Sequence, residues 1–352
     1  MTQKRKNHPD IIKIFATYII VMGHSGVAGY LYYMKVSAPL PRFLFMMNAA
    51  FMQAATIPLY AMISGAFLLP REESLTSLFR KRVLRFFLLL ATFSLISYLY
   101  SFFREGGSLS VREFLCNLFS YEQVYSYWYL YAYLAFLVVL PFLRILANRM
   151  TDTDYRYFFA IAVVYYLMSP LAYLLLREPL SPSDNFVPFT VQTLIFFPLA
   201  GHYIENRLDD TVFTKKNTWI AILIAVAGLA FEAGVQYLYS LRYQGENYGP
   251  DLYLTCLTVV PGPAIYFAVK ALLLHRSIGD GLRKLILFFS STSFGVYLLH
   301  HIYLKETAPI GRILKDRLGL FPGNLVWVLL ICLLGTAVSW LLKKLPGFRK
   351  ML

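Results

Sequence analysis

Charged residues are scarce in this chain. Asp, Glu, Lys and Arg together make up 15% of its 352 residues, against roughly 25% in an average soluble domain. Hydrophobic residues make up 58%, and they fall in runs of about 20, the length of a helical membrane span. This composition excludes a soluble enzyme, a disordered scaffold, a disulfide-rich secreted module and a porin-type barrel.

Cysteine and acidic residues are also few. The three cysteines, Cys116, Cys256 and Cys332, lie far apart and form no CxxC pair. We therefore expect packing residues, with no disulfide framework and no metal site. The chain has 19 acidic residues and 33 Lys and Arg residues, which gives a net charge of +14. In a soluble protein this excess would suggest nucleic acid, but here the cations are concentrated between the apolar runs.

The apolar runs predict an all-α polytopic membrane bundle with about ten transmembrane helices. The predicted spans are 11–31, 43–69, 83–103, 125–147, 157–176, 187–205, 218–240, 251–274, 285–304 and 323–342. The first run is too long for a cleaved signal peptide. Loops on the side of the N-terminus carry a roughly twofold excess of Lys and Arg, which predicts an N-in/C-in topology in the cell membrane. We expect one multipass domain over 1–352, with anionic lipid rather than nucleic acid beside its cations.

One outer loop, segment 104–124, is long enough to have structure of its own. Its apolar residues recur at helical spacing, so we expect a helix that lies on the outer surface.

Ionisable residues inside spans are costly, and each is a candidate for function. The candidates are Lys13, His24, His202, Glu232, Lys270, His300 and His301. Lys270 and His202 lie near inner span ends, and Lys270 is expected to reach the inner surface.

His24 is the strongest single candidate. Lys13 lies eleven residues before it, about three helical turns or roughly 16 Å, so the two side chains share one helix face. Gly23, Gly26 and Gly29 flank the histidine and allow close approach of a helix or a ligand. The alternative is a histidine that only bridges two helices.

Three candidates share one depth. Counted from the inner surface, His24, Glu232 and His300 all lie roughly 20 Å into the membrane. A layer of two imidazoles and a carboxylate suits general acid/base chemistry on a hydroxyl. Depth does not give lateral position, so three unrelated polar residues are the alternative. His301 points about 100° away from His300 and is expected to be interfacial.

Two further patterns lie at the ends of spans. Arg82 and Arg85 lie one turn apart at the inner end of the third span, where paired guanidinium groups suit phosphate. The alternative is ordinary positive-inside charge. Tyr127, Trp128 and Tyr129 open the fourth span at the outer side. They form either an interfacial aromatic belt or a stacking platform for a sugar.

Six segments carry motifs in a fixed order. They are Asp10-Ile11-Ile12-Lys13 followed by His24, Ile63-Ser64-Gly65-Ala66-Phe67, Phe79-Arg80-Lys81-Arg82-Val83-Leu84-Arg85, Tyr127-Trp128-Tyr129-Leu130-Tyr131 through Pro141, Phe197 to Tyr203, and Ser293-Phe294-Gly295-Val296-Tyr297-Leu298-Leu299-His300. Along nearly the whole chain this set resembles the acyltransferase 3 family of integral membrane acyltransferases. Tyr127 stands where relatives often carry a histidine, and Lys13 where many carry arginine.

The resemblance implies a donor such as acetyl-CoA that enters from the cytoplasm. It implies His24 as the essential histidine, and Lys13, Arg82 and Arg85 as donor-binding residues. No tightly bound cofactor is expected.

The resulting prediction is a membrane O-acyltransferase, foremost an O-acetyltransferase. It would move an acyl group from cytoplasmic acyl-CoA to a hydroxyl of an envelope polysaccharide or lipid-linked glycan. A small-molecule transporter or permease is the main alternative, although we find no internal repeat of the kind that marks many transporters. A structural subunit of a glycan assembly complex is the third possibility.

Overall fold

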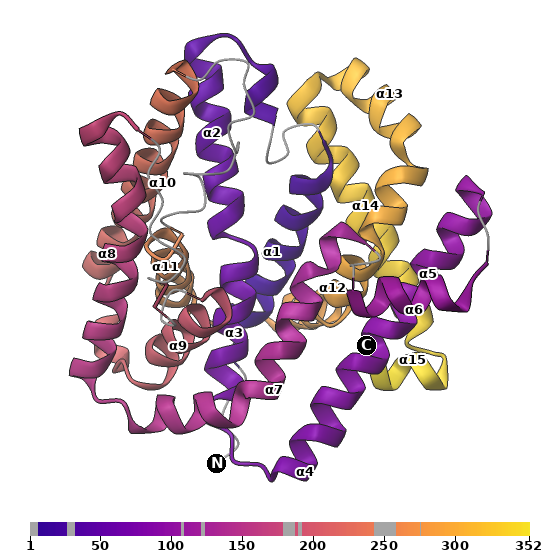
Figure 1. Ribbon diagram of the computed structural model, residues 1–352, viewed down its shortest axis with the longest axis horizontal. Coiled ribbons are helices and arrows are strands. Elements are labelled where there is room, and N and C mark those ends of the chain that lie inside the picture. The colour runs from indigo at the N-terminus through magenta and orange to yellow at the C-terminus, as the bar shows by residue number, and fades with distance from the viewer. Residues whose placement is uncertain are drawn as a thin grey trace.

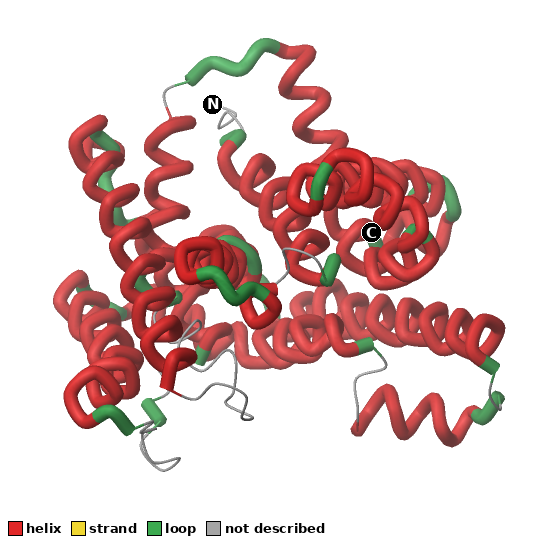
Figure 2. Tube along the Cα trace, turned by 90° about the horizontal axis from the view of Figure 1, so that it is seen from above, coloured by secondary structure: helices red, strands yellow, loops and turns green. Residues whose placement is uncertain are grey.

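Helices make up nearly all of the structure, a computed structural model that describes residues 6–26, 32–106, 109–120, 124–178, 187–188, 192–242, 258–274 and 276–352. No strand occurs among these residues. Figure 1 shows the N-terminus and α4 at one end of the bundle, and α13 at the opposite end. Figure 2 shows the same helices from above. The all-α class predicted from the apolar runs is confirmed.

Fifteen α-helices are described. Their bounds are α1 (His8–His24), α2 (Pro39–Ala54), α3 (Ile57–Leu68), α4 (Leu75–Leu78), α5 (Leu84–Glu105), α6 (Val111–Ser120), α7 (Trp128–Arg149), α8 (Asp152–Leu176), α9 (Thr193–Asn206), α10 (Lys215–Arg242), α11 (Pro261–Leu274), α12 (Asp280–Glu306), α13 (Ala308–Leu318), α14 (Leu320–Leu342) and α15 (Pro346–Met351). Short 3-10 turns are η1 (Tyr32–Lys35), η3 (Tyr125–Tyr127) and η5 (Asp210–Val212), and η2 (Phe79–Val83) is a π-helical turn.

Seven continuous helical stretches in the described chain are long and apolar enough to cross a membrane. They are Pro39–Leu68, Leu75–Arg104, Tyr125–Arg149, Asp152–Leu176, Lys215–Arg242, Asp280–Glu306 and Leu320–Leu342. The polytopic bundle is thereby confirmed. The three other predicted spans coincide with the shorter helices α1, α9 and α11, so ten crossings and the N-in/C-in topology stay predictions.

Two of the long stretches are not regular helices. The second predicted span breaks at Thr56, whose backbone leaves the helical region (φ −115°, ψ −102°) directly before α3. Pro58 lies in the first turn of α3, where a missing N–H costs nothing but continuation from α2 is blocked. The stretch Leu75–Arg104 contains the π turn η2, in which the Leu84 N–H donates to the Phe79 carbonyl.

Two glycines let α3 and α9 cross in backbone contact. A Cβ added at Gly65 would lie 1.9 Å from the carbonyl oxygen of Pro198, and one added at Gly201 would lie 2.0 Å from that of Met62. No side chain fits into such a space, so glycine is required at both positions.

Helix α1 packs against α12, α14, α3, α11 and α2. Figure 1 shows it in the middle of the bundle, with α2 on one side and α12 and α14 on the other. Most side chains on α1 therefore face another helix, with Phe15 an exposed exception, and this explains why the short helix carries buried polar residues.

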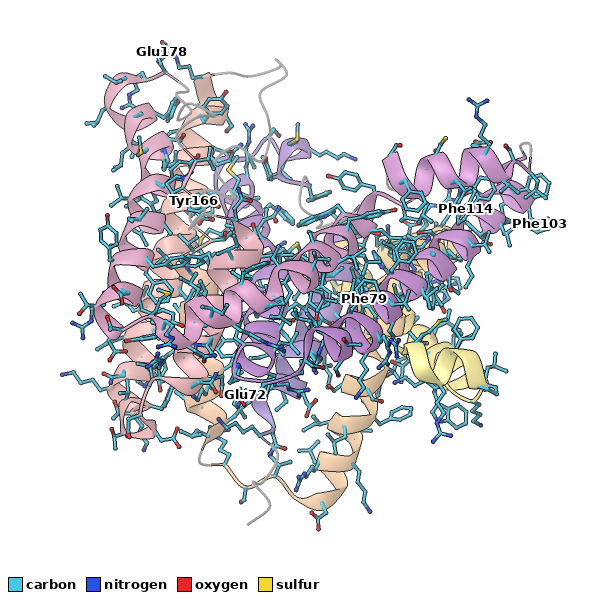
Figure 3. All side chains as sticks on the ribbon, turned by 60° about the horizontal axis from the view of Figure 1, so that its bottom comes forward. Glu72, Phe79, Phe103, Phe114, Tyr166 and Glu178 are labelled. Carbon is cyan, nitrogen blue, oxygen red and sulfur yellow. The ribbon has the colours of Figure 1, made fainter. Side chains whose placement is uncertain are left out.

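Segment 111–120 forms the predicted helix, α6, which folds back along α5. The ring of Phe114 packs on Tyr98, and that of Phe119 on Phe87, at centroid distances of 5.7 and 6.1 Å. Figure 3 shows Phe103 and Phe114 on these two neighbouring helices. Cys116 is exposed on α6, so the expectation that it packs inside is wrong. Cys332 is partly buried, and Cys256 lies outside the described residues.

Candidate functional site

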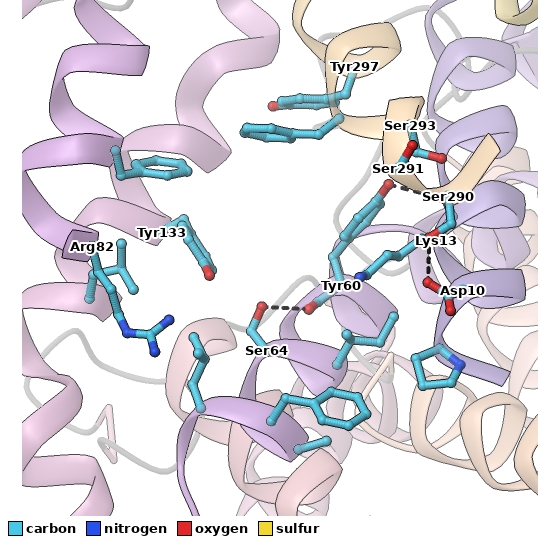
Figure 4. Close-up of a pocket in the computed structure, with 18 of the residues that line it drawn as sticks. Asp10, Lys13, Tyr60, Ser64, Arg82, Tyr133, Ser290, Ser291, Ser293 and Tyr297 are labelled. Atoms are coloured by element: carbon cyan, nitrogen blue, oxygen red, sulfur yellow. Dashed lines mark hydrogen bonds between the residues drawn. The ribbon is translucent and has the colours of Figure 1, made fainter. Parts of the chain in front are cut away.

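A cavity of about 1020 Å³ opens between α1, α3, η2, α5, α7 and α12. Four of the predicted site residues, Lys13, Arg82, Arg85 and Tyr129, line it. Figure 4 shows Arg82 and Tyr133 on one side of this space, Lys13 and Asp10 on the other, and Ser64 between them. The structure thus brings together predicted site residues from α1, from η2 with α5, and from α7, which are far apart in the sequence.

Cations dominate the lining of this cavity. They are Lys6, Lys13, Arg71, Lys81, Arg82, Arg85 and Lys343. The acidic lining residues are Asp10, whose Oδ1 accepts a 2.6 Å hydrogen bond from Ser290, and Glu205. Both carboxylates already have partners in the protein, so the cavity favours an anionic ligand with several charges.

Arg82 and Arg85 differ in their surroundings. Arg82 lies in the π turn η2, and its Nε donates to Glu73 Oε1 at 2.6 Å. Arg144, from α7, donates to the same oxygen at 2.7 Å. Arg85 is exposed, and in the described part of the chain its hydrogen-bond contact is to the Met351 carbonyl at 3.4 Å. The spacing of the two arginines was readable in the sequence, but Glu73 and Arg144 were not singled out.

The cavity ends one helical turn short of two histidines. Its lining includes Ile20 and Tyr297. The Ile20 carbonyl accepts from His24 Nδ1 at 2.9 Å, and the Tyr297 carbonyl accepts from His300 Nδ1 at 2.5 Å. A carbonyl can only accept, so each Nδ1 carries the proton in these bonds. In a neutral ring, Nε2 is then the basic nitrogen.

The two histidines form a pair between α1 and α12. Their ring centroids lie 5.1 Å apart at an interplanar angle of 43°. His300 is fully buried, and its Nε2 has no hydrogen-bond partner among the described residues. His24 is half-buried. A buried basic nitrogen next to a second imidazole is an arrangement suited to proton transfer.

His301 extends this pair sideways. Its centroid lies 6.0 Å from that of His300, and its Nε2 is 3.1 Å from the hydroxyl of Ser97. The Tyr127 ring packs on it edge to face, at 5.6 Å. His301 is half-buried on α12, in contact with Ser97 of α5 and Tyr127 of η3.

The three aromatic residues at the start of α7 have different surroundings. Tyr127 is fully buried, and its hydroxyl donates to the Leu298 carbonyl at 2.5 Å. Trp128 is 41% exposed. Tyr129 is buried in the protein and lines the cavity, with its ring 6.3 Å from that of Tyr297. Since these rings do not share one open surface, their role in sugar stacking stays a prediction.

Glu232 lies in another part of the bundle. It is buried on α10, beside Leu229 and Ala233, which pack in a cluster with residues of α2. Helix α10 packs mainly on α11, α2 and α8, whereas the histidine pair lies between α1 and α12. A direct role of Glu232 beside His24 therefore gains no support from the geometry.

A buried charge cluster at the N-terminal end of α1 was missed in the sequence. Glu205 accepts from His8 Nε2 at 2.5 Å and from Lys6 Nζ at 2.9 Å. Lys270 Nζ lies 3.6 Å from the same carboxylate and donates to the Ile204 carbonyl at 2.8 Å. Lys270 is 0% exposed, so the expectation that it reaches the inner surface is wrong. The carboxylate makes its burial possible, because a paired ammonium group loses less on leaving water.

The remaining candidate, His202, is also structural in its contacts. It is buried on α9, and its Nδ1 is hydrogen-bonded to the Tyr155 hydroxyl at 2.9 Å. In the described part of the chain, no group of three or more His, Cys, Asp or Glu side chains could hold a metal ion.

Comparison with known proteins gives one match. The family model described as an acyltransferase domain, that of the acyltransferase 3 family, matches residues 7–344. No curated protein and no solved structure matches the chain significantly. The matched range covers α1 to α14 and ends before α15, and it includes the whole histidine pair and the residues of the cavity from Pro9 to Lys343. The chain therefore belongs to the acyltransferase 3 family and is a membrane acyltransferase.

Proposed function

We propose that this protein is an O-acetyltransferase that takes its acyl group from acyl-CoA on the cytoplasmic side. The acceptor is a hydroxyl of an envelope polysaccharide or of a lipid-linked glycan. One observation carries the proposal: a single cavity connects the cations Lys13, Arg82 and Arg85 with the two residues whose carbonyls hold the histidine pair.

The open end of the cavity suits the phosphates of coenzyme A. Charge-assisted contacts to phosphate are worth roughly 1.5–3 kcal/mol each. The rise along α1 from Lys13 to His24 is roughly 16 Å, comparable with an extended pantetheine arm. Phosphates held by Lys13 and Arg82 would therefore present the thioester beside His24, one turn beyond Ile20 at the end of the cavity.

His24 is the group proposed to move the proton. Its Nε2 takes the proton from the acceptor hydroxyl as the oxygen attacks the thioester carbonyl. The carbon–sulfur bond then breaks, an ester forms, and the imidazolium returns its proton to the CoA thiolate. His300, with its basic Nε2 next to His24, stabilises the imidazolium. A hydroxyl needs this help because it is a poor nucleophile at neutral pH.

The transporter hypothesis predicts a different outcome with the same cavity, since a permease binds an anion without cleaving it. The test uses purified protein in lipid nanodiscs with acetyl-CoA and a glycan acceptor, and it measures free CoA and acetylated product by mass spectrometry. We expect both products from the wild type and neither from His24→Ala. Binding of CoA without any thioester cleavage would favour the permease or the structural subunit.

The identity of the acceptor and of the acyl group is tested separately. Envelope glycans from cells with and without the gene are compared by mass spectrometry, and the loss of one acetyl mass is the expected difference. Competition between acetyl-CoA and longer acyl-CoAs on the purified protein then shows whether acetyl is the preferred group.

A further inference from the structure

The guanidinium group of Arg82, which is proposed to bind a donor phosphate, is already hydrogen-bonded to the carboxylate of Glu73. Glu73 lies in the short segment between α3 and α4, and its Oε1 accepts from Arg82 Nε at 2.6 Å and from Arg144 at 2.7 Å. Burial alone would raise the pKa of Glu73, but the hydrogen bonds and charges of the two arginines outweigh it and lower this pKa below its ordinary value. At neutral pH the group is therefore an anion between two cations.

The two arginines are not held equally. Arg144 is 10% exposed in its side chain, and its Nε donates in addition to the Leu68 carbonyl at 3.0 Å. The Arg82 side chain is 22% exposed, and among the described residues its hydrogen-bonding partner is Glu73 alone. Arg82 can therefore leave Glu73 by a side-chain rotation, while Arg144 stays fixed to the carboxylate.

The Arg82–Glu73 bond lies between two cavities. Arg82 lines the cavity that leads to the histidine pair, whereas Glu73 and Arg144 line a second cavity of about 830 Å³. Arg71 lines both. A phosphate that enters the first cavity thus meets Arg82 from one side while Glu73 holds it from the other.

We propose that Glu73 sets the donor affinity of the protein because Arg82 exchanges this carboxylate for a phosphate of the donor. This inference rests on the proposed function, since it assumes that the first cavity binds coenzyme A. The exchange leaves no charge without a counterion: Arg82 gains phosphate oxygens, and Glu73 keeps Arg144. Without the donor, Glu73 prevents Arg82 from binding other anions tightly.

The test is a binding titration of coenzyme A to the full-length purified protein, measured by calorimetry. Glu73→Gln keeps the shape of the side chain and removes its charge. It should tighten binding about tenfold, because a charge-assisted hydrogen bond no longer has to be broken. Glu72→Gln is the matched control: Glu72 is exposed, and its removal should change the affinity less than about twofold.

A double variant separates this exchange from a general gain of positive charge. In an Arg82→Ala background, Glu73→Gln should give no gain, because the competing guanidinium is gone. The inference is overturned if Glu73→Gln weakens or leaves unchanged the binding of CoA, if Glu72→Gln tightens it equally, or if the gain persists without Arg82.

Two further outcomes are distinguishable. If the wild type neither binds CoA nor transfers an acyl group, the proposed function and this inference fail together. If it does both and Glu73→Gln has no effect, only the inference fails. Should Glu73→Gln not fold, Glu73→Asp replaces it: the carboxylate then lies one methylene further from Arg82, which lengthens their hydrogen bond, so CoA binding must also tighten.

Discussion

The imidazole rings of His24 and His300 lie 5.1 Å apart, although they come from opposite ends of the chain. Their helices, α1 and α12, run in the same direction, and a second contact fixes their register: Ser290 donates to Asp10 at 2.6 Å near the start of α1. Each ring is also oriented by a carbonyl of its own helix. The pair is thus built by packing and hydrogen bonding before any ligand arrives.

Replacing His24 should separate chemistry from binding. We expect His24→Ala to lower acyl transfer by about 10²- to 10⁴-fold, the usual cost of losing a general base. Binding of CoA should persist, because Lys13 and Arg82 lie at the other end of the cavity. Both quantities are measured on the same purified variant.

His202→Ala is the matched control for this loss of an imidazole, since His202 bonds to Tyr155 and does not line the cavity. Its transfer rate should stay within a few-fold of the wild type. Transfer by His24→Ala at a wild-type rate would remove His24 from the mechanism. Loss of both transfer and CoA binding would favour a histidine that only bridges helices.

Arg82 and Arg85 should differ in their effect on CoA affinity. Arg82→Ala is expected to weaken binding by one to two decades, the value of about 1.5–3 kcal/mol for a charge-assisted contact. Arg85→Ala should weaken it less, because this side chain is exposed. Arg80→Ala provides the control, since Arg80 belongs to the same basic segment without lining the cavity. If all three alanine variants weakened CoA binding equally, the affinity would depend only on the total positive charge of this segment.

The crossing of α3 and α9 should not tolerate a side chain. Gly65→Ala and Gly201→Ala must separate two backbones, and each should destabilise the protein by about 1–3 kcal/mol. Gly234→Ala, on α10, is the control, because a Cβ there meets nothing within 4 Å. Thermal unfolding in detergent should show lower midpoints for the first two variants and an unchanged or raised midpoint for the third. A stable Gly65→Ala protein would contradict the close crossing.

The buried charge cluster should depend more on its anion than on any one cation. Glu205→Gln leaves the buried ammonium of Lys270 without a counterion, which costs about 3–5 kcal/mol. Lys270→Met should cost less, because Glu205 keeps His8 and Lys6. The double variant should lose less unfolding free energy than the sum of the losses in the two single variants.

An exposed ion pair supplies the comparison for this cluster. Glu178 and Arg242 are 58% and 45% exposed at 3.2 Å, and Glu178→Gln should change the stability by less than about 1 kcal/mol. Additive losses in the Glu205 and Lys270 variants would show that the two groups do not interact.

Cys116 provides a native probe of topology. It is exposed on α6, and the N-in/C-in prediction places segment 104–124 outside. In a variant with Cys256 and Cys332 replaced by serine, a membrane-impermeant thiol reagent should label Cys116 in intact spheroplasts. Labelling only after lysis would reverse the topology, and a cysteine introduced at the exposed Val111 controls for access to the thiol.

Depth in the bundle could be predicted from the sequence, whereas lateral position could not. Residue counts put His24, Glu232 and His300 in one layer. The first and third are neighbours, because α1 packs on α12, but Glu232 is on α10, which packs elsewhere. Helix pairing depends on side-chain fit over the whole bundle, and a single sequence does not contain it in readable form.

The buried ion pairs show the same limit. Glu73 and Arg144 are 71 positions apart, and Lys270 lies 65 positions after Glu205, so no local pattern joins them. The break at Thr56, in contrast, had a local signal, because Pro58 disfavours a continuous helix over 43–69. The exposed Cys116 was missed because burial was inferred from residue type instead of from its position on the amphipathic α6.

The π turn η2 contains one residue more per turn than the α-helix that follows it, since the Leu84 N–H reaches back five positions to Phe79. Removing a single residue from Phe79–Val83 would let the chain continue as a regular α-helix from α4 to α5. All residues on the α4 side would then rotate by about 100° relative to α5. The span would remain equally apolar, but Arg82 would no longer face Glu73 and the cavity together. A sequence comparison that allows one gap here would therefore align two proteins with the same membrane helices and different cavities.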